Sequence, residues 1–263
     1  MIGAFSFNGI HASAFNLVCR SVIRPLLPPV KTRRVELSGV SGAYDYPSSE
    51  YDLRQITMRI IYIGENYYEL RSRAREIAAW LAAEDFSKLI MDDENDKYYL
   101  AKVTSELDLS HFWESGAIDV IFDCQPFAYS MNAQNVIITG SGIITNPGTR
   151  KIGNTSPPGS VLTLTCMSVP NNTRILVNGG TPNVGYFIYG NETSVTTPAG
   201  DLIVDVTNMK ATIGDQNAYP YLGGNIDRFF DLQPGNNTIA AFVGGTTTPL
   251  NLQMRVEYIP MWY

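Results

Sequence analysis

One segment, Arg75–Tyr129, constrains the fold more than any other part of the chain. It starts with the end of an amphipathic helix and continues with three apolar runs that polar stretches separate. Short apolar runs bounded by turn residues are typical of β-strands. The charges, turns and aromatic residues are placed to build a scaffold, and none is grouped like a catalytic site. The segment predicts a hairpin of two strands, Lys88–Met91 and Tyr98–Thr104, joined by an acidic turn at Asp92–Lys97. A third strand is predicted at Ala117–Cys124, and the unit is expected to end at Pro126.

An amphipathic helix is predicted ahead of these strands. Asn66 is a good N-cap residue, and Glu69 three residues later can complete a capping box. Glu69 and Arg73 stand four residues apart, in the order that favours a surface ion pair. One apolar stripe at helical spacing faces the core, formed by Leu70, Ala74, Ile77, Ala78 and Leu81.

The strands on either side of the helix alternate between apolar and polar residues. A period of two places every second side chain on one face of a sheet. A helix flanked by a strand and a hairpin forms an α+β layer with mostly antiparallel pairing. The apolar faces are Ile56, Met58, Ile60 and Tyr62 in one strand, and Ile118, Val120, Phe122 and Cys124 in another, where Asp119 and Asp123 point the other way.

The second half of the chain differs from the first in composition. Residues 1–130 contain 13 Lys and Arg and 18 Asp and Glu, whereas residues 131–263 contain only 6 and 7. The second half is rich in Thr, Asn and Gly instead, and such a shift is typical of a domain boundary. We therefore expect a first domain at 1–130 and a second domain at 131–263.

The second domain is predicted to be all-β. Short strand-like runs alternate with turn signals such as Asn178-Gly179 and Pro234-Gly235, and this pattern predicts a β-sandwich or jelly roll. No helix is expected except a short turn near Asp227–Asp231. Two polar, Pro- and Gly-rich stretches, Asn146–Gly159 and Thr181–Pro198, are expected to be loops. The strands are expected within residues 136–142, 160–167, 173–180, 186–190, 201–206, 237–243 and 252–259.

Charge and cysteine spacing argue against several classes of protein. The net charge of −6 argues against a general nucleic-acid-binding surface, which is usually basic. Cys19, Cys124 and Cys166 lie far apart with no CxxC or Cys/His cluster, so we expect buried free thiols in a reducing compartment. Met1–Asn16 lacks the basic start and apolar core of a signal peptide. No apolar run approaches the roughly eighteen residues of a membrane span.

No enzyme or metal motif is present, and we expect no cofactor. His11 and His111 are the only histidines, and neither accompanies a recognisable Ser or Cys nucleophile. Counted from Asp92, the acidic run has Lys97 and Val103 where an EF-hand needs Gly and Glu. A pair of acids placed by the fold for glycoside hydrolysis remains an alternative.

Charged residues of the first domain are candidate interface residues. Arginine is favoured at interfaces because its fork pairs with carboxylates. An acidic turn and an arginine-bearing helix could form complementary faces of neighbouring subunits, whereas the alternative is an ordinary solvated surface. The candidates are Arg71, Arg73 and Arg75 on the helix, and Asp92, Asp93, Glu94 and Asp96 in the turn.

The order and spacing of several segments resemble the distal tail protein (Dit) family of long-tailed siphophages. About half the chain is similar to the N-terminal domain of that family, and the chain end is similar to its last strands. The segments in the first half are Ile2–Leu17 (IGAFSFNGIHASAFNL), Arg24–Val30 (RPLLPPV), Val35–Pro47 (VELSGVSGAYDYP), Lys88–Val103 (KLIMDDENDKYYLAKV) and Cys124–Ser130 (CQPFAYS); those at the end are Asp231–Gly245 and Val256–Tyr263.

The resemblance implies a structural protein of a phage tail tip or baseplate, and not an enzyme. The first domain, an α+β or β-sandwich domain, would build a hexameric ring that joins the tail tube protein to the tail-associated hub or lysin protein. DNA would pass through the ring without specific binding, and no membrane would be contacted. The second domain would be a galectin-like or carbohydrate-binding-module-like sandwich that points outward and could carry receptor-binding proteins. Such a protein would be part of the virion, assembled in the host cytoplasm.

The main alternative function is a carbohydrate-binding module that contacts the cell-wall polysaccharide of the host. A sandwich fold does not by itself show sugar binding. Sugar sites usually need exposed aromatic rings, and Trp is absent from the second domain until Trp262. The candidates for sugar or partner contact are Tyr186, Tyr189, Tyr219 and Tyr221.

Overall fold

The computed structural model of the chain separates into two compact units. The first contains Met1–Met131 together with Tyr263, and the second contains Asn132–Trp262. The two units are described separately below. The structure describes residues 4–36, 38–39, 41–46, 50–64, 67–106, 112, 115–178, 186–190, 197–224, 229–244 and 246–263.

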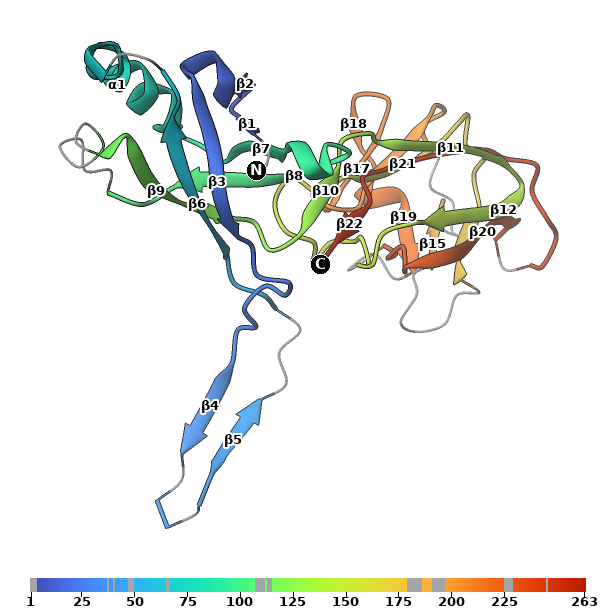
Figure 1. Ribbon diagram of the computed structural model, residues 1–263. Helices are drawn as coiled ribbons and strands as arrows, with labels where there is room; N and C mark the ends of the chain where they lie inside the picture. The colour runs from blue at the N-terminus through green and yellow to red at the C-terminus, as the bar shows by residue number, and fades with distance from the viewer. Residues whose placement is uncertain are drawn as a thin grey trace. The chain divides into compact units, whose positions relative to one another are not determined.

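The first unit is built on an antiparallel sheet with the strand order β2-β1-β7-β8-β9-β6-β3 (Figure 1). β10 continues from β9 after Pro126 and pairs with the start of β8, so that Tyr129 lies opposite Tyr98. The strands are β1 (Phe5–Phe7), β2 (Ile10–His11), β3 (Leu17–Ile23), β6 (Arg54–Tyr62), β7 (Ser87–Met91), β8 (Lys97–Val103), β9 (Ala117–Cys124) and β10 (Ala128–Ser130); the helices are α1 (Tyr67–Leu81) and the 3-10 turns η1 (Ala12–Phe15) and η2 (Asp92–Glu94).

The predicted helix is confirmed as α1, with one correction to its apolar stripe. Ala74, Ile77 and Leu81 are buried as expected, but Ala78 is exposed. Trp80 is buried instead, and its indole Nε1 donates to the backbone oxygen of Phe7 at 2.8 Å. The helix is therefore rotated so that its largest side chain, rather than a small alanine, faces the sheet. The expected N-cap Asn66, and the side chains of Glu69 and Leu70, lie outside the described residues.

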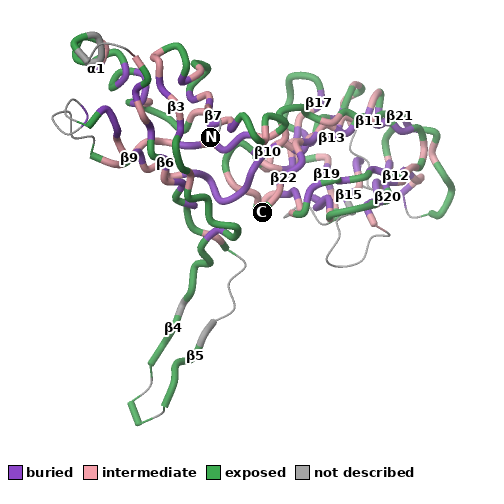
Figure 2. Tube along the Cα trace, viewed as in Figure 1, coloured by how far each residue is buried: buried purple, intermediate pink, exposed green. Residues whose placement is uncertain are grey.

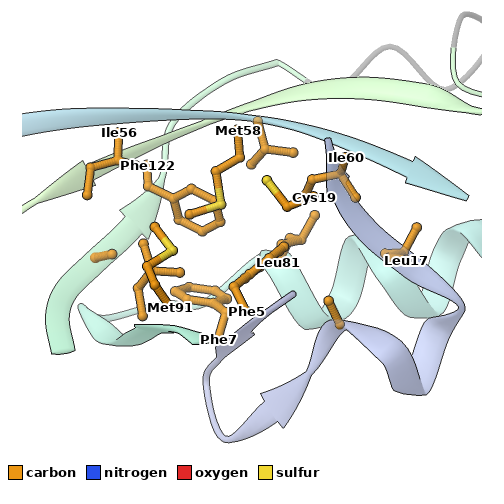
Figure 3. Packing of buried hydrophobic residues seen from close by; sticks show 14 of the residues in the cluster. Phe5, Phe7, Leu17, Cys19, Ile56, Met58, Ile60, Leu81, Met91 and Phe122 are labelled. Carbon is orange, nitrogen blue, oxygen red and sulfur yellow. The ribbon is translucent and has the colours of Figure 1, made fainter. Parts of the chain in front are cut away.

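The core of the first unit lies between α1 and one face of the sheet. β6 alternates as predicted, because Ile56, Met58 and Ile60 are buried while the residues between them are more exposed. In β9 the expected face is also buried, with Ile118 only partly so, and Asp119 and Asp123 point away from the core. Figure 3 shows Ile56, Met58 and Ile60 of β6 packed around an aromatic centre that includes Phe5, Phe7 and Phe122.

Two further strands of the first unit stand outside this sheet. Among the described strands, β4 (Arg33–Glu36) and β5 (Ala43–Tyr46) pair only with each other, with Val35 opposite Tyr44. The chain enters and leaves this hairpin as a second paired stretch, because the N–H of Lys31 donates to Glu50 and the N–H of Asp52 donates to Pro29. Figure 2 shows the described part of the hairpin as exposed.

The second unit is a β-sandwich, as predicted. One sheet has the order β11-β21-β13-β16-β17-β18 and the other β12-β20-β14-β15-β19. The buried sides of both sheets are mainly aliphatic, as in Leu164, Val204 and Ile175, with a few aromatic residues such as Phe187 and Tyr258. The strands are β11 (Gln134–Thr139), β12 (Ser141–Asn146), β13 (Leu162–Cys166), β14 (Thr173–Val177), β15 (Tyr186–Tyr189), β16 (Leu202–Asp205), β17 (Lys210–Ile213), β18 (Gln216–Asn217), β19 (Leu222–Gly224), β20 (Gly235–Val243), β21 (Gln253–Tyr258) and β22 (Met261–Trp262).

The seven predicted strands of the second unit are all observed, but several others were missed. β12 follows β11 after the single residue Gly140, whose φ of 71° gives the left-handed turn that glycine allows. β17, β18 and β19 are too short or too polar to stand out by alternation. The short turn expected near Asp227–Asp231 falls partly outside the described residues. Most of the loop expected at Thr181–Pro198 also lies outside them, and the prediction is wrong for the part that forms strand β15. A 3-10 turn, η4 (Tyr219–Tyr221), is present instead.

Burial of the thiols predicts a loss of stability at high pH. Desolvation raises the pKa of the Cys124 thiol, and raises that of Cys166 from 9.0 to about 12. A thiol with a raised folded-state pKa stabilises the fold fully below its unfolded pKa, and this contribution is lost as pH rises toward the folded value. We expect the free energy of unfolding to fall above about pH 9 by up to about 1.4 kcal/mol per pH unit for each thiol. Urea denaturation across that range measures the slope, which should be shallower in a Cys124→Ala/Cys166→Ala variant.

The compactness of the second unit predicts that it folds alone. Tyr263 belongs to the first unit, where its ring packs against Phe127 and its hydroxyl lies 3.3 Å from that of Tyr51. A protein of residues 132–262 should therefore melt cooperatively as an all-β domain, at the same temperature as one of residues 132–263. Calorimetry and circular dichroism measure both. The absence of a cooperative transition in both proteins would show that the boundary is wrong.

Candidate interaction surfaces

The acidic turn is a fixed feature rather than a loose tip. η2 connects β7 to β8, and its first carboxylate, Asp92, accepts the backbone N–H of Ala4 at 3.1 Å. The Oε2 of Glu94 lies 2.9 Å from Arg24 Nη1, and its Oε1 lies 3.0 Å from Lys97 Nζ. Asp93 and Asp96 form similar contacts with Arg24 and Lys97, at 3.7 and 3.1 Å. The turn thus presents a positioned set of carboxylates that internal cations partly neutralise.

His11 belongs to this turn and has a structural role, as expected. Its Nε2 lies 3.3 Å from Asp92 Oδ2, and its Nδ1 lies 2.6 Å from Ser13 Oγ. The order Ser13–His11–Asp92 superficially resembles a catalytic triad. However, His11 Nδ1 also accepts the backbone N–H of Ser13 and so caps η1, which leaves its lone pair engaged as a cap rather than free to act as a base. The other histidine, His111, lies outside the described residues.

The helix arginines lie on a separate part of the first unit. Arg71 and Arg75 are exposed on α1, and Arg73 is half-buried. Nothing in the isolated chain tests whether these arginines face the acidic turn of another subunit, and that pairing stays a prediction.

The structure reveals an apolar surface that the sequence analysis missed. Between β3 and β6 the chain exposes Leu26, Leu27 and Val30, and the hairpin adds its opposed pair Val35 and Tyr44. We refer to these five residues as the hairpin surface. Leu26 and Tyr44 are 86% and 63% exposed, which is unusual for residues of their size. The signal in the sequence was the run PLLPPV, where leucines lie between prolines that prevent a buried helix or inner strand.

The aromatic candidates of the second unit that the structure describes, Tyr189, Tyr219 and Tyr221, are buried or half-buried. Tyr189 is fully buried, and its hydroxyl donates to the backbone oxygen of Pro198 at 2.6 Å. Tyr219 and Tyr221 are half-buried, and the Tyr219 hydroxyl donates to Met209. In this structure Tyr189 therefore presents no ring face to a ligand. The side chain of Tyr186 lies outside the described residues.

No cofactor or metal site emerges from the part of the chain that the structure describes. Within it, no three His, Cys, Asp or Glu side chains gather as metal ligands would. The three cysteines are buried as free thiols, as expected. None of the described helices has the length and apolar character needed to cross a membrane.

Comparison with known proteins agrees with a scaffold built for assembly. Residues 17–124 match the model of a family described as "phage tail protein RIFT-related domain". The matched stretch is therefore similar to a phage tail domain. It covers the sheet from β3 to β9 together with α1 and the hairpin. No curated protein matches the chain in sequence.

The whole chain also has the fold of a solved tail protein. It superposes on the crystal structure of Dit (gp 19.1) of phage SPP1, described as a paradigm of hub adsorption apparatus in phages infecting Gram-positive bacteria. The TM-score is 0.72 at 15% identity, and 99% of each chain is covered. The resemblance to distal tail proteins found in the sequence is therefore confirmed at the level of the fold.

Removal of the charges in the acidic turn should separate stability from assembly. In a variant with Asp92→Asn, Asp93→Asn, Glu94→Gln and Asp96→Asn, we expect the free energy of unfolding to change by no more than about 1 kcal/mol, because exposed ion pairs contribute little. We expect assembly with another subunit or a partner to weaken, and high salt to weaken the unmodified protein in the same way. Urea denaturation and sedimentation at two salt concentrations measure both effects. Unchanged assembly at low salt would reduce the turn to a solvated feature.

Proposed function

We propose that this protein forms a hexameric ring at the end of a siphophage tail. The ring joins the last ring of the tail tube to the tail-associated hub or lysin protein, and the first unit builds it. The second units carry peripheral or receptor-binding proteins. The observation that carries the proposal is the agreement of the whole chain, over 99% of its length, with the fold of a distal tail protein.

The hairpin surface supports assembly through the first unit. A two-stranded hairpin is at best marginally stable by itself in water, and β4 and β5 pair with no other described strand. Val35 and Tyr44 lie opposite each other and are exposed, so no described residue covers their side chains as an apolar partner. A neighbouring subunit supplies such a partner in a ring closed by head-to-tail contacts, in which two different faces of each subunit meet.

The charge of the chain is compatible with the passage of DNA. Phosphate contacts with Lys and Arg retain DNA and make its binding depend on salt. The net charge of −6 reduces any such general retention. We propose that DNA crosses the ring without specific binding, and that assembly takes place in the host cytoplasm, where the buried thiols remain reduced.

A carbohydrate-binding function has less support. The aromatic candidates of the second unit that the structure describes are buried or half-buried, and Tyr189 is closed off entirely. Glycan-array binding of the isolated second unit tests this alternative. Saturable micromolar binding to cell-wall polysaccharide, about −8 kcal/mol, would promote it over the scaffold role of that unit.

Ring formation is tested directly on the purified chain. Mass photometry and negative-stain electron microscopy should show six-fold rings, either for the protein alone at high concentration or after addition of the hub protein. A protein that remains monomeric under all these conditions, and that forms no ring within virions, would overturn the proposal.

A double substitution should show whether the hairpin surface holds the ring together. In Val35→Ser/Tyr44→Ser, we expect unfolding to change by no more than about 0.5 kcal/mol because both side chains are exposed. Ring formation should require a higher protein concentration, because apolar area buried between subunits is lost. The matched control is Ile137→Ser/Ile143→Ser in the second unit, where the two isoleucines are 59% and 60% exposed. Equal assembly of the two variants would exclude a role for the hairpin surface.

A further inference from the structure

Arg54 is the largest fully buried side chain of the chain, although it carries a charge. It is the first residue of β6, and it points to the same face as Ile56 and Met58. Only 1% of its surface is exposed. A buried guanidinium is normally paired with an anion, because the loss of hydration otherwise destabilises the fold.

The guanidinium of Arg54 has one weak partner and two nitrogens without any. Its Nη1 donates to the Tyr99 hydroxyl at 3.4 Å, and the Tyr99 ring centre lies 5.5 Å from its Cζ. Its Nε and Nη2 find no hydrogen-bond acceptor among the described residues. These two nitrogens form the side-on edge of the guanidinium, with parallel N–H bonds that fit the two oxygens of a carboxylate. Tyr99 thus accepts from one nitrogen of the group, and the paired edge is buried without a described acceptor.

Several carboxylates of the first unit are bonded to other side chains and do not accept a hydrogen bond from Nε or Nη2 of Arg54. Arg24 holds Glu94 and Asp93. Asp123 accepts from Gln55, which points to the opposite face of β6. Burial lowers the pKa of Arg54, and the nearby positive charge of Arg24 adds to this effect. Within the described residues, Arg54 therefore lacks a counter-ion.

We propose that the side-on edge of Arg54 receives a carboxylate from a second copy of this chain when the ring closes. This inference rests on the proposed ring. The hairpin surface is tied to the start of β6, because the N–H of Asp52, two residues before Arg54, donates to the backbone oxygen of Pro29, which follows the exposed Leu26 and Leu27 in the chain. Since the guanidinium is covered in the free chain, the carboxylate enters as the interface forms and its neighbours shift.

The net charge of the chain favours a second copy of this chain as the source of the carboxylate that binds Arg54. Each chain carries a net charge of −6, so two copies repel each other unless cations lie in the contact. Because Arg54 has no counter-ion among the described residues of its own chain, it can attract a carboxylate of the acidic neighbour without breaking an existing ion pair. A bidentate contact also fixes the relative orientation of two subunits, which a closed ring requires.

The test compares the stability of the monomer with the concentration at which rings form. Arg54→Met replaces the unpaired charge by an apolar side chain of similar length, so the monomer should melt no lower than the unmodified protein. Ring formation should require a concentration higher by on the order of tenfold or more. Arg54→Lys keeps the charge but lacks the paired edge, and it should also assemble less well. Arg255→Met, an exposed arginine of the second unit, is the control that should assemble normally.

The outcomes separate this inference from the ring itself. An unmodified protein that forms rings, with Arg54→Met and Arg54→Lys assembling equally well, overturns the role of Arg54 and leaves the ring intact. A markedly lower melting temperature of Arg54→Met, with normal assembly once folded, assigns Arg54 to the fold alone and also overturns it. An unmodified protein that never assembles overturns both. A map of the ring should place carboxylate oxygens within about 3.2 Å of both Nε and Nη2.

Discussion

The contact of α1 with the aromatic centre of the sheet organises the first unit. Trp80 stacks on Phe15 with ring centres 5.0 Å apart, and on Phe5 at 5.8 Å. Its indole N–H is bonded to the backbone oxygen of Phe7, so the polar end of the ring is not left unsatisfied in the core. The N-terminal strand, the 3-10 turn and the helix are thereby fixed to one another. The face of the sheet opposite this contact is left to cross-strand pairs such as Arg59 with Asp119 at 3.0 Å.

The helix closes one face of the sheet. The chain segment that connects β3 to β6 can therefore contain exposed leucines and a hairpin that add nothing to the core. β6 alternates regularly from Ile56 to Tyr62 and anchors this region. The chain between the two strands then extends into the hairpin, whose described side chains are exposed. The sheet thus carries a two-stranded hairpin that receives no support from its other described strands, as we propose for a subunit of a ring.

The elements that could be predicted from the sequence are those with long, regular patterns. α1, β6, β9 and the seven strands of the second unit follow from alternation and helical spacing. Ala78 was assigned to the wrong side because helical spacing alone allows a stripe on either side of Ile77, and the volume of Trp80 decides between them. β4 and β5 could not be found by a buried face, since their described side chains are all exposed.

The candidate interaction residues were harder to predict for a related reason. An acidic run is easy to recognise in the sequence. The sequence does not show that Arg24, seventy residues away, neutralises part of the charge of this run. Arg54 looks like any surface arginine until its place in the alternation of β6 puts it on the buried face. In a strand, side chains alternate between the two faces of the sheet. The position of a residue in this alternation, rather than its type, decides whether it is buried.

Three features of the first unit lack a partner among the described residues. A hairpin without a third strand and leucines exposed between prolines add little to the stability of the free subunit, and an arginine buried without a counter-ion lowers it. They occur in one continuous stretch of chain, between Arg24 and Arg54, whereas the neighbouring core is well packed. Since each of these defects is removed by a different kind of contact, by strand pairing, apolar burial or ion pairing, a single protein partner that supplies all three explains them together better than a solvated surface does.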